Sequence, residues 1–326
     1  MQNLIVQRMR RTSARLGLVA CVIVMGTFAN GCTTNAATGE SRLAIGYMST
    51  SQQIALGEDA MPALTKEYGG ETPSVSLQGY VTEVGAKMAR KTEAENPSLP
   101  WEFTLLDSPV INAFALPGGK VFMSRGLAEK MTNEAQLAGV LGHEIGHVTA
   151  EHIAERVQTQ TGTAVLVQVL STAAGMGDSA ALQQLTDVVV GYGGQGYLLK
   201  FGRDQELEAD RLGMRYMALA GYDPVGQRQV MEILSKASEG PRPPEFLSTH
   251  PHPDSRIEQI ETLLRTDYAR VTGRRTHGLY EQRFERRFLN PVSKLPAAKA
   301  DAGGRGVMSV AWCGVCGADL LALDDR

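Results

Sequence analysis

Residues 141–147 are Leu-Gly-His-Glu-Ile-Gly-His, within a run that has the periodicity of a helix. Side chains four residues apart lie on one face of a helix, so His143 and His147 are placed to bind one metal ion together. Glu144 lies one residue further round, where it can take a proton from a water held by that ion. The pattern H-E-x-x-H is typical of zinc peptidases, and it predicts a helix at the centre of the fold.

A chance match is the alternative for such a short pattern. Three fixed positions in five residues also occur by accident, and both imidazoles would then be ordinary core or surface side chains. The rest of the chain must therefore supply a further ligand and a suitable context before the pattern indicates a site.

The first 31 residues predict a signal peptide. Arginines in residues 8–15 precede an apolar stretch, residues 16–28, which is too short to span a membrane comfortably. The following segment resembles the lipobox of bacterial lipoproteins, so we expect Cys32 to carry a lipid; secretion without lipidation, giving a soluble periplasmic protein, is the alternative. Thr33 replaces the Asp of inner-membrane lipoproteins, which favours the periplasmic face of the outer membrane.

Composition sets the limits of the remaining chain. The formal net charge is −3 with no basic block, so we expect no nucleic-acid partner. Residues 32–50 are small and polar and predict a tether. Cys313 and Cys316 form a C-x-x-C pair in a Gly-rich tail without the strand-to-helix context of a redox site. A local disulfide or an incidental pair is the preferred interpretation, and a redox function is kept as a further hypothesis.

Hydrophobic periodicity predicts an α+β, mainly helical fold with a small β-sheet that precedes the motif helix. The predicted helices cover residues 51–68, 74–91, 124–131, 133 to about 157, 205–220, 224–237 and 254–268, and the predicted strands cover 101–106, 110–116 and 120–123. The apolar residues 160–190 predict a helical hairpin, and the Gly-rich residues 191–196 a hinge or lid. An exposed strand edge at Asn112, Ala113 and Phe114 would align an extended peptide substrate.

Three glycines interrupt the predicted motif helix, namely Gly139, Gly142 and Gly146. Each costs about 1 kcal/mol relative to Ala in a helix interior. The cluster therefore predicts that another element, either the sheet or the helix of a third ligand, packs closely against this one.

The third ligand has to come from outside the motif helix. Glu151 and His152 lie about 12 Å or more beyond His143 along a straight helix, whereas metal–ligand bonds are about 2 Å long. The positions that a metzincin fills with Gly and His hold Ala150 and Ile153 here, which excludes that class.

Residues 204–217 supply a better candidate. One helical stripe, containing Asp204 and Glu208, is charged throughout and predicts a solvated face. The other begins with Glu206 and Asp210 and then turns apolar. Buried carboxylates need a partner, so we predict that Glu206 is the third ligand and that Asp210 orients a ligating His.

Four segments together resemble metallopeptidase family 48: residues 112–119 (Asn-Ala-Phe-Ala-Leu-Pro-Gly-Gly), the H-E-x-x-H helix, Glu206-x-x-x-Asp210, and Thr249-His250-Pro251. The resemblance covers roughly residues 51–267. It implies a zincin-like domain over residues 51–270 with one Zn²⁺ per chain, followed by a C-terminal extension, 271–326, that we expect to be poorly ordered from about Leu295.

The resemblance also implies a function. Without long membrane spans, the chain is similar to the periplasmic branch of the family, whose substrates are unfolded or misassembled envelope polypeptides. In that branch the residue matching His250 approaches the zinc and holds the enzyme in check. Arg256 is expected either to pair with an acid near the site or to stabilise a developing oxyanion. A peptide-binding chaperone with His250 as a permanent fourth ligand is the alternative function, and the oligomeric state is not predicted.

Overall fold

The computed structural model describes residues 32–43, 48–93, 99–156, 201–240, 244–251 and 253–299. The predicted hairpin and Gly-rich hinge, the signal peptide, and Cys313 and Cys316 lie outside these ranges. Within them, no helix combines the length and apolar character needed to cross a bilayer.

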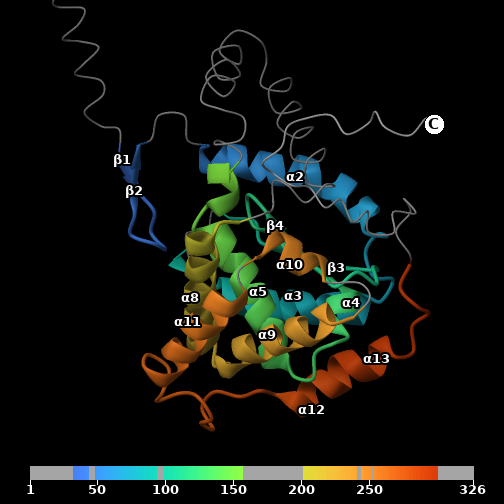
Figure 1. The fold of residues 1–326 in the computed structure, drawn as a ribbon. Helices are drawn as coiled ribbons and strands as arrows, with labels where there is room; N and C mark the ends of the chain where they lie inside the picture. Colours follow the sequence, from blue (N-terminus) through green and yellow to red (C-terminus); the bar gives the residue numbers. More distant parts are fainter. Residues whose placement is uncertain are drawn as a thin grey trace, which may run out of the picture.

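Helices surround a small sheet, as predicted (Figure 1). The helices are α2 (Thr50–Glu67), α3 (Val75–Ala89), α4 (Arg125–Ala128), α5 (Glu134–Thr149), α8 (Arg203–Leu219), α9 (Val225–Ser238), α10 (Glu245–Thr249), α11 (Pro253–Arg265), α12 (Glu281–Phe284), a π-helical turn η3 (Glu285–Leu289) and α13 (Asn290–Val292). The strands are β1 (Cys32–Thr34), β2 (Ser41–Leu43), β3 (Glu102–Leu106), β4 (Ala113–Leu116) and β5 (Lys120–Ser124).

The main sheet has the order β3-β5-β4. The central strand β5 pairs in parallel with β3 and antiparallel with β4, with Phe114 opposite Phe122. β4 therefore lies at the sheet edge. It begins at Ala113 instead of the predicted Val110, because the hydroxyl of Ser124 accepts from the Asn112 N–H at 3.1 Å and donates to the Asn112 carbonyl at 2.9 Å, ending the regular ladder there.

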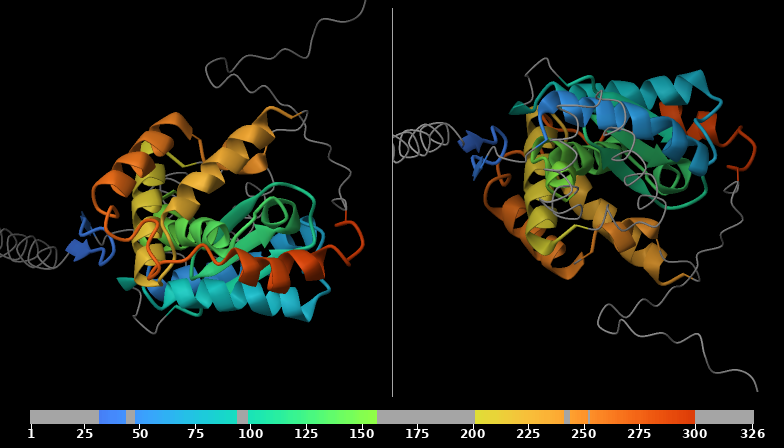
Figure 2. Two further views of the ribbon diagram at one scale, coloured as in Figure 1. Left: turned by 90° about the horizontal axis from the view of Figure 1, so that it is seen from below. Right: turned by 90° about the horizontal axis from the view of Figure 1, so that it is seen from above.

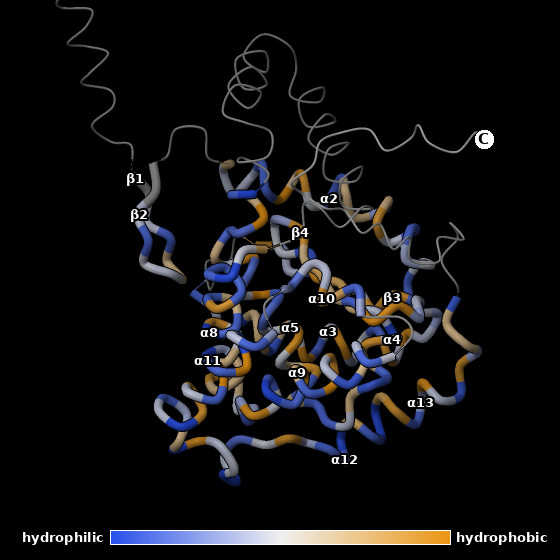
Figure 3. Tube along the Cα trace, in the orientation of Figure 1, coloured by the Kyte–Doolittle hydropathy of each residue, from blue (hydrophilic) through white to orange (hydrophobic). Residues whose placement is uncertain are grey.

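The motif helix α5 forms the centre of the core, and all of its residues are buried. It runs between the sheet and α3 on one side and α8 and α9 on the other (Figure 1). Apolar stretches gather around α3, α5 and the sheet, whereas the outer turns of α8 and α12 are largely hydrophilic (Figure 3). Asn133 caps the helix by accepting a hydrogen bond from the Gln136 N–H at 3.0 Å.

The prediction that α5 continues to about residue 157 is wrong. The helix ends at Thr149, Glu151 takes a left-handed conformation with φ of 60°, and helical turns resume over residues 152–156. The residue with left-handed conformation at the end of a helix is usually Gly. Because Glu occupies this position here, the end of the helix could not be recognised from the sequence.

Part of the chain that the sequence analysis placed outside the domain, residues 281–299, is packed against it. We call residues 281–299 the C-terminal arm. Its Phe284 and Phe288 are fully buried, and both rings lie within 6.4 Å of the Tyr80 ring of α3. The view from below shows the arm (red) beside α3 (Figure 2). Its last described residue, Lys299, donates its backbone N–H to the Asp107 carbonyl at 3.0 Å. The predicted limit at residue 270 is therefore too early, because sequence periodicity over such short helical pieces is weak.

The predicted tether is also partly structured. The strands β1 and β2 pair antiparallel, with Cys32 opposite Leu43. The Asn35 side-chain amide donates to the Thr149 carbonyl at 2.9 Å, at the end of α5. The N-terminal hairpin thus contacts the point at which the motif helix stops.

Candidate metal centre

Four side chains that could hold a metal ion meet in the core: His143 and His147 from α5, Glu206 from α8, and His250 directly after α10. All four are buried, and their ligand atoms lie within 4.8 Å of one another. Two helices and one turn, distant in sequence, therefore converge on one point.

Close helix packing produces this convergence. A Cβ on Gly146 would lie 2.8 Å from the Ala209 carbonyl oxygen, and a Cβ on Gly213 would lie 2.9 Å from the His143 backbone nitrogen. The glycines thus allow α8 to approach α5 closely enough for Glu206 to reach the two imidazoles. The prediction that the Gly cluster marks such an approach is confirmed, and the approaching element is the helix of the predicted third ligand.

Four of the distances between these ligand atoms are close to those around a tetrahedral ion. The Nε2 atoms of His143 and His147 are 3.1 Å apart, and Nδ1 of His250 lies 3.2 Å from Nε2 of His143. Oε1 of Glu206 lies 3.0 Å from Nδ1 of His250 and 3.4 Å from Nε2 of His147. Ligands about 2.0–2.2 Å from a tetrahedral Zn²⁺ are separated by about 3.3–3.6 Å. Small adjustments would therefore seat zinc among these residues.

The protonation states of the two motif imidazoles also suit a metal. Nδ1 of His143 lies 2.8 Å from Oδ1 of Asp210, a carboxylate that can only accept, so Nδ1 is the donor in this hydrogen bond and Nε2 faces the other ligand atoms. Burial holds the pKa of His147 well below its usual value, which keeps that ring neutral. Neutral imidazoles are the form that binds metals.

Arg256 of α11 holds the acidic residues in place. Its Nε and one terminal nitrogen lie 2.7 Å and 2.8 Å from the two oxygens of Asp210, and its other terminal nitrogen lies 2.8 Å from Oε2 of Glu206. Burial alone would raise the pKa of both carboxyls, but the Arg256 charge, together with His143 at Asp210 and His250 at Glu206, keeps both pKa values below their usual range. Both groups are therefore carboxylates in the folded protein.

Glu144 stands apart from this network. Its side chain is buried, and among the described residues neither carboxylate oxygen takes part in a hydrogen bond. The Nε2 of His250 lies 3.5 Å from Oε1 of Glu144. Burial raises the pKa of Glu144, which makes it a stronger base than an exposed glutamate.

His250 closes the cluster from the side opposite α5. Its backbone N–H bonds the Phe246 carbonyl at 2.8 Å, and its ring stacks on Phe246 with centroids 4.3 Å apart. Phe201 stacks on His147 at 3.8 Å and contributes a second apolar wall. Burial lowers the pKa of His250, but the charges of Glu206 and Glu144 raise it more, so its pKa lies above the usual value. The same negative field favours a bound cation.

The predicted substrate strand lies beside α10. Ala113 and Phe114 are 0% and 1% exposed. The Asn112 side-chain amide donates to Oε1 of Glu245, at the start of α10, at 3.0 Å. The Phe246 N–H bonds the Ile111 carbonyl at 3.2 Å. The segment that carries His250 is thus attached to the two residues that precede the edge strand β4.

Sequence reasoning missed several residues around the centre. Gln227 of α9 donates to Oδ1 of Asp210 at 2.8 Å, and His152 contacts His147. Glu208, assigned to a solvated stripe, forms an ion pair with Arg211 at 3.0 Å but also contacts His152. An isolated Gln or His in a sequence carries no signal of such a role.

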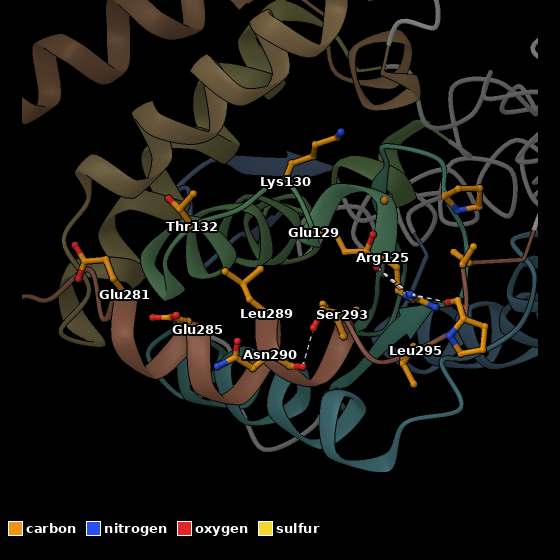
Figure 4. A pocket seen from close by; sticks show the side chains of 16 residues that line it. Arg125, Glu129, Lys130, Thr132, Glu281, Glu285, Leu289, Asn290, Ser293 and Leu295 are labelled. Atoms are coloured by element: carbon orange, nitrogen blue, oxygen red, sulfur yellow. Dashed lines mark hydrogen bonds and ion pairs between the residues drawn. The ribbon is translucent and has the colours of Figure 1, made fainter.

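A cavity of about 960 Å³ lies elsewhere, between α4 and the C-terminal arm. Glu129, Lys130, Glu281 and Glu285 point around its rim (Figure 4). None of the four cluster residues lines it. The centre at His143 and His147 is instead enclosed within the core.

Comparison with known proteins agrees with this geometry. The model of peptidase family M48 matches residues 76–264, more than half of the chain. The beta-barrel assembly-enhancing protease of Escherichia coli K12 is 32% identical over 218 residues, covering 64% of this chain and 43% of that protein. The mitochondrial metalloendopeptidase OMA1 of Arabidopsis thaliana is 35% identical over 220 residues, with coverage of 64% and 43%. OMA1 of Schizosaccharomyces pombe is 32% identical over 213 residues, covering 64% and 60%. The chain therefore spans less than half the length of the first two relatives.

Proposed function

The chain belongs to peptidase family M48, and from this and the buried metal centre we propose that it is a zinc-dependent endopeptidase. The observation that carries the proposal is the convergence of His143, His147 and Glu206 in the core, with the buried carboxylate of Glu144 beside them. When bound, Zn²⁺ supplies Lewis acidity towards a substrate carbonyl and a water.

Glu144 supplies the proton transfers. An oxygen of its carboxylate takes a proton from the attacking water, and the resulting carboxylic acid delivers it to the nitrogen of the leaving amine. The raised pKa of Glu144 suits both steps. Asp210 orients His143, and Arg256 holds Asp210 and Glu206 so that the ligand atoms keep their spacing. In this conformation the guanidinium nitrogens of Arg256 contact the carboxylates of Asp210 and Glu206. These contacts favour a positioning role for Arg256 over a direct contact with an oxyanion.

His250 occupies the place of substrate. A catalytic zinc site keeps one position open, whereas four protein ligands make a closed site. We therefore regard the conformation with Nδ1 of His250 in the cluster as a resting state. Movement of α10 would remove His250 and also release the Phe246 bond to Ile111 at the edge strand. Asn112, Ala113 and Phe114 could then pair with the backbone of an extended substrate.

Misassembled envelope polypeptides are the proposed substrates. The support is the relative named for β-barrel assembly, together with the backbone recognition that an edge strand provides. Relatives named as proteases favour this function over a chaperone with a permanently closed site. Comparing the envelope proteins of cells that carry the parent chain with those that carry Glu144→Gln would identify the substrates.

The variant Glu144→Gln tests the activity. It removes the general base while keeping the size of the side chain, so we expect cleavage of an unfolded polypeptide to fall by about 100- to 10,000-fold. Zinc content, measured by mass spectrometry, should stay at one ion per chain. The matched control is Glu129→Gln, which alters a glutamate at the distant cavity. Parent-like cleavage by zinc-loaded Glu144→Gln would contradict the mechanism.

We further propose that Cys32 carries a lipid that anchors the protein to the periplasmic face of the outer membrane. Replacing Cys32 by Ala should abolish incorporation of labelled palmitate and move the protein into the soluble periplasmic fraction. Lipid anchoring would be contradicted if the parent did not incorporate labelled palmitate and the Cys32→Ala variant remained associated with the membrane.

A further inference from the structure

The end of α5 is bent in a way that costs free energy. Glu151 has φ of 60°, a left-handed conformation that costs a non-Gly residue about 1–2 kcal/mol. Such conformations persist where the surrounding structure holds them, and they gather at functional sites. The Gln53 amide holds this residue by donating to Oε1 of Glu151 at 3.1 Å.

The bend brings His152 onto His147. Residues five apart on a straight helix are rotated by about 140° relative to each other, because each residue turns about 100°. With the bend, Nδ1 of His152 lies 2.9 Å from Nδ1 of His147. His152 is 1% exposed, so this contact is made in the core without competition from solvent.

A carboxylate continues the chain of contacts. Nε2 of His152 lies 3.2 Å from Oε2 of Glu208, whose side chain is 15% exposed. Glu208 belongs to α8 and lies two residues after Glu206, just over half a helical turn away. The three side chains therefore connect the metal cluster to the protein surface along one line of hydrogen-bonding groups.

The hydrogen-bond directions are fixed once Nε2 of His147 is a metal ligand. Its lone pair then faces the ion, so the ring proton is at Nδ1 and is donated to Nδ1 of His152. His152 must accept there, so its own proton is at Nε2 and is donated to the Glu208 carboxylate. Every donor in this sequence has an acceptor.

We propose that His152 and Glu208 are positioning residues for the metal ligand His147. This inference rests on the proposed zinc site. The two ligating imidazoles are thus supported differently: His143 donates directly to a carboxylate, Asp210, whereas His147 reaches its carboxylate, Glu208, through a second imidazole. Such outer contacts fix ring orientation and raise ligand basicity, and their loss weakens metal binding about 10- to 100-fold.

Zinc release from the full-length protein tests the proposal. The protein is loaded with one Zn²⁺ and mixed with excess chelator, and release is followed with a fluorescent zinc indicator. His152→Leu lacks the acceptor, so release should be about 10- to 100-fold faster than from the parent. His152→Asn places an amide oxygen near the position of Nδ1 and should restore slow release. The visible spectrum of the Co²⁺-loaded protein should change in His152→Leu and return towards the parent in His152→Asn.

A second pair of variants avoids changes in the core. Glu208→Ala should also speed release, whereas Arg211→Ala, which removes only the surface partner of Glu208, should not. Adding Glu208→Ala to His152→Leu should have no further effect, because Glu208 acts through His152.

The outcomes separate two kinds of failure. If the parent chain does not retain one Zn²⁺, the proposed metal site itself is wrong. If the parent retains zinc but His152→Leu and Glu208→Ala release it at the parental rate, the site stands and the positioning role is wrong. Equal release from His152→Leu and His152→Asn would also overturn it, since only loss of the acceptor should matter.

Discussion

His250 is the residue on which the state of the centre depends. Its Nδ1 lies among the ligand atoms of His143 and Glu206, and Phe246 supports its ring. A fourth protein ligand and a substrate cannot share one tetrahedral position. The proposed peptidase activity therefore requires the segment that follows α10 to exchange between a closed and an open arrangement.

Replacing His250 by Ala should free that position. If the open state makes up about 0.1–10% of molecules, as minor states commonly do, cleavage of an unfolded polypeptide should rise by about 10- to 1000-fold. Initial rates on a fluorescent casein substrate, at equal zinc content, would measure this. His277→Ala is the control, since His277 bonds the Ala218 carbonyl away from the centre. A large loss of activity in His250→Ala would instead show that His250 assists the reaction.

At this scale the sequence predicts the residues of the cluster and Asp210, but not His152 or Gln227. The i,i+4 spacing of His143 and His147 and the stripe that begins with Glu206 are local patterns, so they are visible in a linear sequence. His152 acts through a bend caused by a left-handed Glu151, and that conformation depends on tertiary contacts such as the one from Gln53. No periodicity contains this information.

Among the elements, the crossing of α5 and α8 matters most. The two helices meet at Gly142, Gly146, Ala209 and Gly213, where backbone lies against backbone. This contact sets the distance between the motif imidazoles and Glu206. The packing of α5 against α8 therefore determines how far apart the backbones of the proposed ligand residues lie.

Gly146→Ala should damage both stability and metal binding. Its Cβ would lie 2.8 Å from the Ala209 carbonyl oxygen, and overpacking of this kind costs about 1–3 kcal/mol. The control is Gly79→Ala, because a Cβ at this exposed helical position of α3 meets nothing within 4 Å. That change should stabilise the protein by about 0.4–1 kcal/mol. Urea unfolding of both variants, with zinc affinity measured beside it, would test the contrast; equal effects would contradict the role of the crossing.

The sequence predicts most helices and all three strands of the main sheet near their observed positions. The errors lie where regular periodicity stops: the end of α5, the start of β4 and the short helices of the C-terminal arm. Hydrogen bonds from Ser124 and contacts across many residues decide these points, and they lie beyond the reach of local patterns.

At the scale of the whole molecule, the C-terminal arm binds the first turn of the motif helix through an ion pair. Glu134, in the first turn of α5, is buried and accepts hydrogen bonds from Tyr80 and Tyr222. Arg283 of the arm forms a bidentate pair with the same carboxylate. Its positive charge balances the buried carboxylate of Glu134.

Arg283→Ala should leave Glu134 without this countercharge. Hydrogen bonds to charged groups contribute about 1.5–3 kcal/mol, and the Arg283 side chain is 37% exposed, so we expect a loss of about 1–2 kcal/mol in the free energy of unfolding. Arg287→Ala is the matched control on the same arm, because it removes a surface pair with Glu83 and a contact over the Tyr80 ring but leaves Glu134 its countercharge, and it should cost less than about 1 kcal/mol. If urea unfolding showed equal losses in the free energy of unfolding for the two variants, the pair between Arg283 and Glu134 would not stabilise the contact of the arm with α5.

The distance in sequence between Arg283 and Glu134, 149 residues, has a consequence for synthesis. A chain that emerges from its N-terminus delivers His143 and His147 long before Glu206, and Glu206 before His250. The countercharge for Glu134 arrives last. A nascent chain therefore holds all four residues of the cluster and the countercharge for Glu134 only after nearly all of the described residues have emerged.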